Sequence, residues 1–263
     1  MLRLYLDAAG HEDNTDVLAV AGYLSSEEQW AAIEHEWRTL LHANGLPFFH
    51  MTDCMAGTGA FARWDRGRRT AMAEDFITII NRHVRAGVGT FVSVPDFRNV
   101  LEPHRKMMTY GSPTSRFPAL SFCVRVTMEY LHNVVLYCEP LTEPIAVTIE
   151  RGDKWQTQML SYCNWLVEQP RWCPNTYGLI VPGEKTVPGL QAADILANRT
   201  YDAGRTYKGS GPLERSFWIE RLDQIERGDE WKHFVIRFGG RETLEQIVET
   251  LRPWWLSVAG AGS

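Results

Sequence analysis

The first 24 residues show two patterns of hydrophobic and polar positions on either side of a polar segment. Residues 2–7 alternate, which predicts a strand with one buried face: Leu2, Leu4 and Leu6 against Arg3, Tyr5 and Asp7. Residues 17–24 (V-L-A-V-A-G-Y-L) are nearly all apolar, as is typical of a central strand covered on both faces. The segment A-A-G-H-E-D-N-T-D between them contains Gly10 and predicts a turn. We therefore expect an antiparallel pair, with Asp7 at the carboxyl end of a central strand.

Helical spacing of apolar residues begins after the second strand. Ser25 and Glu28 form a capping-box pattern, which predicts a helix start, and Gly45 is a natural stop. Short apolar runs predict further strands at residues 47–51, 87–94, 145–149 and 176–181. Helices are predicted at about 72–84, 118–138, 155–166, from 190, at 212–225 and at 242–255, with a short apolar stretch at 233–238.

The connections between these elements bear on topology and domain number. A long helical crossover separates the first strand from the strand that Glu150 closes, which predicts that these two strands are parallel. We find no repeats and no low-complexity linkers in the sequence. The pattern predicts a single domain over residues 1–263, with helical additions at about 102–140 and 210–263.

Composition narrows the class of protein. Apolar residues make up 44% and charged residues 22% of the chain, as in ordinary globular proteins, and the net charge of -5 gives no overall basic footprint. Any binding of nucleic acid must then depend on local patches. The five cysteines are odd in number and scattered, which favours reduced core thiols. We expect no membrane span and no signal peptide, and hence a cytoplasmic protein whose oligomeric state the sequence leaves open.

Three carboxylates stand at the ends or starts of predicted elements. Asp7 and Glu150 end strands, and Asp194 lies near the start of a helix among small apolar residues. Each has a structural alternative: Asp7 as a turn cap, Glu150 paired with Arg151 or Lys154, and Asp194 as a helix cap. Ligands of open sheets collect outside the carboxyl ends of strands, and converging carboxylates stay ionised only when a cation neutralises them. Oxygen ligands without clustered Cys or His suit Mg²⁺ or Mn²⁺.

Four segments of the chain carry a resemblance to a known family. They are Y-L-D-A-A-G at residues 5–10, the apolar strand ending A-G-Y-L, F-H-M-T-D at 49–53 and G-L-Q-A-A-D-I-L-A-N at 189–198. With these, the chain resembles the domain-of-unknown-function family 3800, which is placed among ribonuclease-H-like folds. The last segment is the most specific, because the family pattern there is Leu-Gln-x-Ala-Asp-x-x-Ala. The resemblance implies a mixed sheet, antiparallel in its first strands and parallel in its later ones, flanked by helices.

The resemblance also implies a chemistry. In ribonuclease-H-like enzymes, carboxylates hold two divalent ions for phosphodiester hydrolysis. By position, Asp7 would bridge the ions, and Glu150 and Asp194 would each serve one of them. The family's first motif is usually Asp-Glu-Ser-Gly, whereas here Ala8 and Ala9 replace the second acid and the serine. That departure weakens the metal site unless another acid substitutes: Glu12, Asp13 or Asp153.

Candidate substrate contacts are cationic or polar residues near these acids. A segment with four arginines and an interleaved aromatic suits phosphates and an unpaired base: Arg63, Trp64, Arg66, Arg68 and Arg69. The alternative is a solvated loop and helix start with Asp65 pairing locally. A second cationic group comprises Arg105, Lys106 and Arg116. His11, His50 and Lys185 are candidates to assist proton transfer or hold a phosphate, though each also has an ordinary structural reading, and Gln191 shares a helix face with Asp194.

These observations together indicate a metal-dependent nuclease with nucleic acid as its partner. Two alternatives remain open. One is a catalytically weakened module that binds nucleic acid or a protein, which the alanine at position 8 favours. The other is a hydrolase of small phosphoesters, which the modest overall charge leaves open.

Overall fold

The computed structural model describes residues 1–11, 13–104, 118–138, 143–152, 154–169, 173, 175–207, 233–239, 241, 244–246, 248 and 249. The strands are β1 (Leu2–Ala9), β2 (Val17–Ser26), β3 (Ala86–Ser93), β4 (Ile145–Glu150), β5 (Tyr177–Gly183) and β6 (His233–Gly239). The helices are α1 (Glu27–Ala43), α2 (Met51–Ala56), α3 (Arg66–His83), α4 (Val94–Val100), α6 (Pro118–Cys138), α7 (Lys154–Val167) and α8 (Pro188–Thr206), with short 3-10 turns η1 (Gly59–Phe61) and η2 (Glu102–His104).

The six strands form one mixed sheet in the order β5-β4-β1-β2-β3-β6. Strand β1 pairs antiparallel with β2, and β2 pairs antiparallel with β3. On its other side β1 is parallel to β4, which is parallel to β5. These directions confirm two predictions: the short turn makes β1 and β2 antiparallel, and the long crossover makes β1 and β4 parallel. The stretch at 233–238 becomes an edge strand, parallel to β3.

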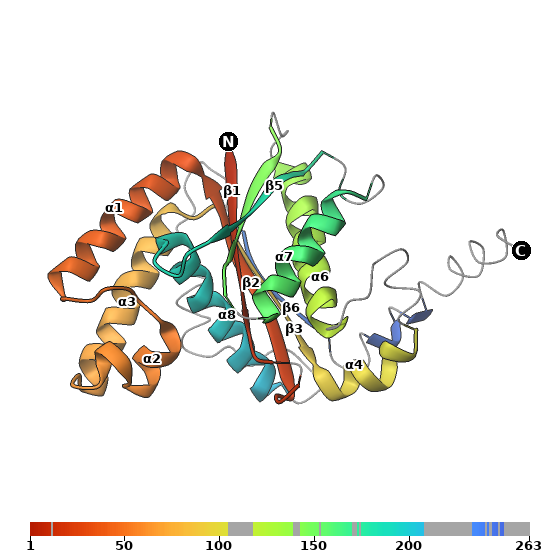
Figure 1. Cartoon of the computed structure of the whole chain (residues 1–263), viewed down its shortest axis with the longest axis horizontal. Coiled ribbons are helices and arrows are strands. Elements are labelled where there is room, and N and C mark those ends of the chain that lie inside the picture. The colour runs from red at the N-terminus through yellow and green to blue at the C-terminus, as the bar shows by residue number, and fades with distance from the viewer. Residues whose placement is uncertain are drawn as a thin grey trace, which may run out of the picture.

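Helices cover both faces of this sheet (Figure 1). Helices α1, α3 and α8 pack on one face around Trp37, Phe49 and Phe76, and helices α4, α6 and α7 pack on the other. The antiparallel first strands, the parallel later strands and the two helical layers confirm the predicted mixed sheet flanked by helices. The central position of β1 also places the end of that strand, with Asp7, in the middle of the molecule rather than at an edge.

The alternation along β1 and β4 decides which face receives the acids. Leu4 and Leu6 belong to the core beneath α6 and α7, so the odd-numbered Tyr5 and Asp7 point to the α8 face. In β4, Ile145, Val147 and Ile149 join the same core as Leu4, which leaves Glu150 on the α8 face. Leu6 pairs with Ile149, so the next residues of the two strands, Asp7 and Glu150, lie at adjacent strand ends.

Helix α8 packs close to the sheet because small residues line its contact. A Cβ atom on Gly189 would lie 2.5 Å from the Tyr5 ring, and one on Gly204 would lie 2.7 Å from Val17 Cγ1. Neither approach is possible for a larger residue without a shift of the helix. The small residues of the G-L-Q-A-A-D segment therefore allow α8 to bring Asp194 against the ends of the strands.

Two local predictions were wrong in detail. The cap of α1 is Ser26, whose hydroxyl accepts a hydrogen bond from the Gln29 amide, whereas Ser25 is buried and donates to the His83 carbonyl. The predicted strand at 47–51 does not form, because the backbone amides of Phe49 and Met51 bond to side chains of α8 instead of a neighbouring strand. Residue Met51 instead begins α2.

Other predictions concern thiols, membranes and the helical additions. The four described cysteines, Cys54, Cys123, Cys163 and Cys173, are buried free thiols. No helix in the described part of the chain is long and apolar enough to cross a membrane. The addition at 102–140 includes α6, whereas the predicted helices at 212–225 and 242–255 fall wholly or largely outside the described residues.

Candidate active site

A cavity of about 640 Å³ opens where β1 and β4 end and α8 crosses them. The structure places all three predicted acids, Asp7, Glu150 and Asp194, on its wall. They come from β1, β4 and α8, which are far apart in sequence. The two strands supply one wall of the cavity, hereafter the sheet wall, and α8 supplies the facing one, the α8 wall.

Asp7 is the most deeply buried of the three acids, with 6% of its surface exposed. Burial raises the pKa of its carboxyl well above the usual range, and the charges of Asp194 and Glu150 raise it further. A hydrogen bond from the Ala8 backbone and the charge of Lys185 oppose this rise in pKa. Ionised Asp7 is therefore costly in the protein by itself, and a cation held in the cavity would remove that cost.

Asp194 has a structural role in addition to its place on the cavity wall. Its Oδ2 accepts a hydrogen bond of 2.7 Å from the backbone N–H of Met51, and its Oδ1 lies 4.0 Å from His50 Nε2. Burial raises the pKa of Asp194, while His50, the Met51 amide, Lys185 and Arg199 act against the rise. One carboxylate oxygen is thus engaged with the backbone, and the other faces the cavity side of His50.

His50 is held by a neighbouring carboxylate. Its Nδ1 lies 2.8 Å from Asp53 Oδ2, and Asp53 Oδ1 accepts a hydrogen bond of 2.9 Å from the Thr58 hydroxyl. The hydrogen bond from His50 lowers the pKa of Asp53 below its usual range. Because a carboxylate only accepts hydrogen bonds, His50 carries its proton on Nδ1 in this arrangement, and Nε2 is directed toward Asp194. His50 lines the cavity, and its part in proton transfer or phosphate binding remains a prediction.

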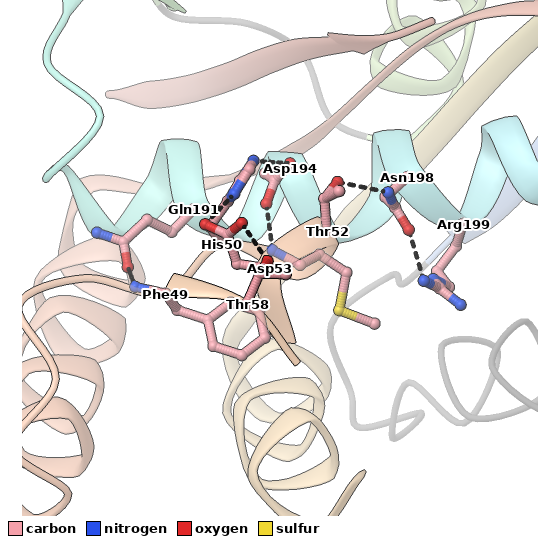
Figure 2. Close-up of polar contacts among 10 residues, drawn as sticks. Phe49, His50, Thr52, Asp53, Thr58, Gln191, Asp194, Asn198 and Arg199 are labelled. Atoms are coloured by element: carbon pink, nitrogen blue, oxygen red, sulfur yellow. Dashed lines mark hydrogen bonds and ion pairs between the residues drawn. The ribbon is translucent and has the colours of Figure 1, made fainter. Parts of the chain in front are cut away.

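Three polar side chains on successive turns of α8 hold the segment 49–52 in place (Figure 2). Gln191 accepts hydrogen bonds from the Trp37 indole (2.9 Å) and the Phe49 amide (2.7 Å), and Asp194 accepts from Met51. Asn198 donates to the Thr52 hydroxyl at 3.1 Å. Gln191 is buried and does not line the cavity, so the structure assigns it a supporting position; its predicted contact with substrate remains a prediction.

The cations around the cavity differ from those that the sequence pointed to. Lys185 lines it as predicted, and the sequence reasoning missed two further arginines of α8, Arg199 and Arg205. Arg199 is buried and pairs with Asp202 (Nη1 to Oδ2, 3.2 Å), and Arg205 is exposed in the last turn of the helix. Arg205 lies eleven residues after Asp194, about three helical turns, so it shares the face of Asp194, and this spacing was the signal that could have located it. Arg199, five residues after Asp194, has no such signal.

The arginine segment at 63–69 does not reach the cavity. Arg63, Arg66 and Arg68 are exposed at the start of α3, and the guanidinium of Arg68 lies 3.8 Å above the Trp64 ring. Arg69 donates hydrogen bonds to the carbonyls of Cys54 and Met55. Asp65 caps α3 by accepting from the Arg68 amide, as the alternative of a solvated helix start implied. Binding of substrate by this segment remains a prediction without support from the cavity.

Several predicted ligands lie outside the described residues. They are Asp153 and Glu12, and the second cationic group of Arg105, Lys106 and Arg116. Among the residues that are described, no three side chains of His, Cys, Asp or Glu stand close enough together to hold a metal ion directly. The three carboxylates thus share one cavity and act on one another electrostatically, without closing around an ion.

Comparisons with known proteins give a distant likeness to a solved structure. No family model matches the chain, and no curated protein matches it. Among solved structures, the chain is similar to Bst-RNase HIII in complex with Mn²⁺, with 15% identity and a TM-score of 0.39. The match covers 95% of this chain and 71% of that chain. Because the identity and the TM-score are both low, the chemistry of the cavity has to be inferred from the residues of this chain.

Proposed function

We propose that this protein hydrolyses phosphodiester bonds of nucleic acid with the help of divalent metal ions held by Asp7, Glu150 and Asp194. One observation carries the proposal: three carboxylates from β1, β4 and α8 line a single cavity. The charges of Glu150 and Asp194 make ionisation of buried Asp7 more costly. Buried carboxylates that raise the free-energy cost of ionising one another are uncommon unless a cation neutralises them. Such sites are candidates for function rather than for stability.

In chemical type the donor set suits a hard divalent cation, although the described acids do not close around an ion. All three side chains offer carboxylate oxygens, which suit Mg²⁺ or Mn²⁺, and Asp7 is desolvated already. When bound, such ions lower the pKa of a water and stabilise the leaving oxygen of a phosphodiester. Because Asp194 Oδ2 is occupied by the Met51 amide, Oδ1 is the oxygen that Asp194 has left to offer.

Two other residues of the cavity serve the same reaction: one offers a positive charge to the phosphate, and the other is placed to transfer a proton. Lys185 already acts electrostatically on Asp7 and Asp194, and its ammonium suits a phosphate oxygen. His50 is fixed by Asp53 with Nε2 toward Asp194, where it is placed to exchange a proton with a reacting water or leaving group. We also propose that this chain belongs to the domain-of-unknown-function family 3800, as the four sequence segments indicate.

A melting assay with and without metal tests the proposal together with a cleavage assay. We expect Mn²⁺ or Mg²⁺ to raise the melting temperature of the wild type, because a ligand that binds only the folded state stabilises it. We also expect metal-dependent cleavage of single- or double-stranded DNA or RNA. The Asp7→Asn variant should show a much smaller shift and no cleavage. Absence of both effects in the wild type would refute the proposal.

A second candidate is a ribonuclease-H-like module that binds a partner without catalysis. Two observations favour it: Ala8 and Ala9 replace the acid and serine of the family motif, and the described acids do not close around an ion. In that case the wild type would bind nucleic acid or a protein with the same strength in EDTA and in Mn²⁺. Binding of equal strength in EDTA and in Mn²⁺, with neither a metal-dependent melting shift nor cleavage, therefore identifies the binding module.

A further inference from the structure

We infer that the substrate is a nucleic-acid strand several nucleotides long, which runs along α8 from Asp194 toward Arg205. This inference rests on the proposed function and names the substrate of the same site. It starts from the residues of α8 that line the cavity: Asp194, Asn198, Arg199, Tyr201, Asp202 and Arg205. Asp194, Asn198, Tyr201 and Arg205 are four, three and four residues apart, so these four follow one stripe of the helix over its last three turns. The cavity is therefore a channel along the helix rather than a pit at the acids.

The length of this stripe exceeds a single nucleotide. Eleven residues separate Asp194 from Arg205, which corresponds to ~16 Å of helix axis. A stacked strand rises only ~3.4 Å per nucleotide, so a strand that places one phosphate at the acids and another at Arg205 spans about three to five nucleotides, with the reach of the arginine included. A mononucleotide bound at the acids leaves the far end of the cavity empty.

The charges along the channel suit a phosphate backbone. Lys185, just before α8, and Arg205, in its last turn, precede and follow Asp194 along the chain, and both line the cavity. Asp202 would repel a phosphate, but Arg199 pairs with it at 3.2 Å. Arg205 makes no ion pair within the described part of the chain, and its guanidinium lies 5.9 Å from the Tyr201 ring. An arginine fork beside an aromatic ring suits a phosphate next to an unpaired base.

The exposed arginines of α3 provide a matched comparison. Arg68 resembles Arg205 in being an exposed helical arginine beside an aromatic ring, here Trp64, but it does not line the cavity. Replacement of either arginine by glutamine removes one positive charge from the surface. If the strand follows α8, only the Arg205→Gln replacement removes a phosphate contact.

The experiment measures binding without cleavage, in EDTA and in the Asp7→Asn background of the whole chain. The probes are fluorescein-labelled thymidine monophosphate, dT2, dT8 and rU8, followed by fluorescence anisotropy at several salt concentrations. We expect affinity to rise about tenfold or more from dT2 to dT8, because further phosphates and bases are engaged. The additional Arg205→Gln change should reduce the slope of log K against log salt by about 0.7 for dT8, since one phosphate contact of a single strand is lost. Arg68→Gln should leave this slope unchanged.

Three results would overturn the inference. If thymidine monophosphate or dT2 binds as tightly as dT8, the site takes a small phosphoester. If Arg68→Gln reduces the salt slope and Arg205→Gln does not, the strand follows the start of α3. If neither dT8 nor rU8 binds, no strand occupies the channel. Because no step requires hydrolysis, these results are independent of whether the wild type cleaves; the comparison of dT8 with rU8 shows whether the channel favours DNA or RNA.

Discussion

Both walls of the cavity carry carboxylates, but they hold them in different ways. On the sheet wall, Asp7 is buried at a strand end, where its hydrogen bond from the Ala8 amide does not offset desolvation and the neighbouring acids. On the α8 wall, Asp194 stands between Gln191 and Asn198, and all three bond to the segment 49–52. The comparison shows that ionised Asp7 lowers the stability of the protein, whereas Asp194, whose pKa burial also raises, accepts a hydrogen bond that holds the segment 49–52.

The largest expected effect is on catalysis at the sheet wall. Asp7→Asn keeps the size of the side chain but removes its charge, so metal-dependent cleavage should fall roughly a thousandfold, in line with the several kcal/mol that a metal supplies. The melting temperature of the variant in EDTA should be equal to or above that of the wild type, because the variant lacks the buried charge that Glu150 and Asp194 repel. Asp16→Asn, at an exposed acid outside the cavity lining, is the control and should cleave normally. Cleavage by Asp7→Asn at the wild-type rate would contradict the assignment.

The next effect concerns the α8 wall and stability alone. Gln191→Leu leaves two buried donors without an acceptor, the Trp37 indole and the Phe49 amide. Each unsatisfied donor costs about 1–3 kcal/mol, so the free energy of unfolding, measured with urea, should fall by roughly 2–6 kcal/mol. Gln169→Leu, which removes one hydrogen bond at the end of α7, is the control and should cost less than about 1 kcal/mol. Equal losses in the two variants would show that the row on α8 does not hold the segment.

A pair of substitutions at Asp194 separates its two roles. Asp194→Ala removes the acceptor of the buried Met51 amide and should lower the free energy of unfolding by about 1–3 kcal/mol. Asp194→Asn keeps an acceptor oxygen and should cost clearly less, yet both variants should lose the metal-induced rise in melting temperature. If Asn proves as destabilising as Ala in EDTA, the bond to the Met51 amide depends on the charge of Asp194 as well as on an acceptor oxygen. If neither variant lowers the free energy of unfolding, Asp194 does not hold the segment, and the difference between the walls disappears.

The smallest effect is a pH dependence of stability. The pKa of Asp7 is raised in the folded state, so the folded protein binds a proton more tightly than the unfolded chain does. The stability that this group contributes is present below its unfolded pKa of about 3.9 and is lost as the pH rises through the folded value. Urea unfolding in EDTA from pH 4 upward should therefore show a fall in stability that is smaller in Asp7→Asn. Saturating Mn²⁺ should remove most of the difference, and identical pH profiles in EDTA would contradict the raised pKa.

Patterns along the chain were sufficient for the sheet and for the acids on it. Period-two alternation in residues 2–7 and the apolar run at 17–24 predicted β1, β2 and their antiparallel pairing, and the long crossover predicted the parallel β4. The same alternation fixes the direction of Asp7, because a residue of a strand shares its face with the residue two positions away. Local patterning alone therefore identifies the acids that stand at strand ends.

Contacts between distant segments decided the rest. Residues 47–51 are apolar enough for a strand, but their amides bond to Gln191 and Asp194, which lie more than 140 residues away. The arginines at 63–69 are close together in sequence and yet lie outside the cavity, whereas Arg205 reaches it because a helix brings every third or fourth residue to one face. Local sequence determines the period of each element and hence its faces. Which faces meet, and therefore which charges share a cavity, depends on packing such as that of α8 on β1, where Gly189 lets the helix approach the Tyr5 ring.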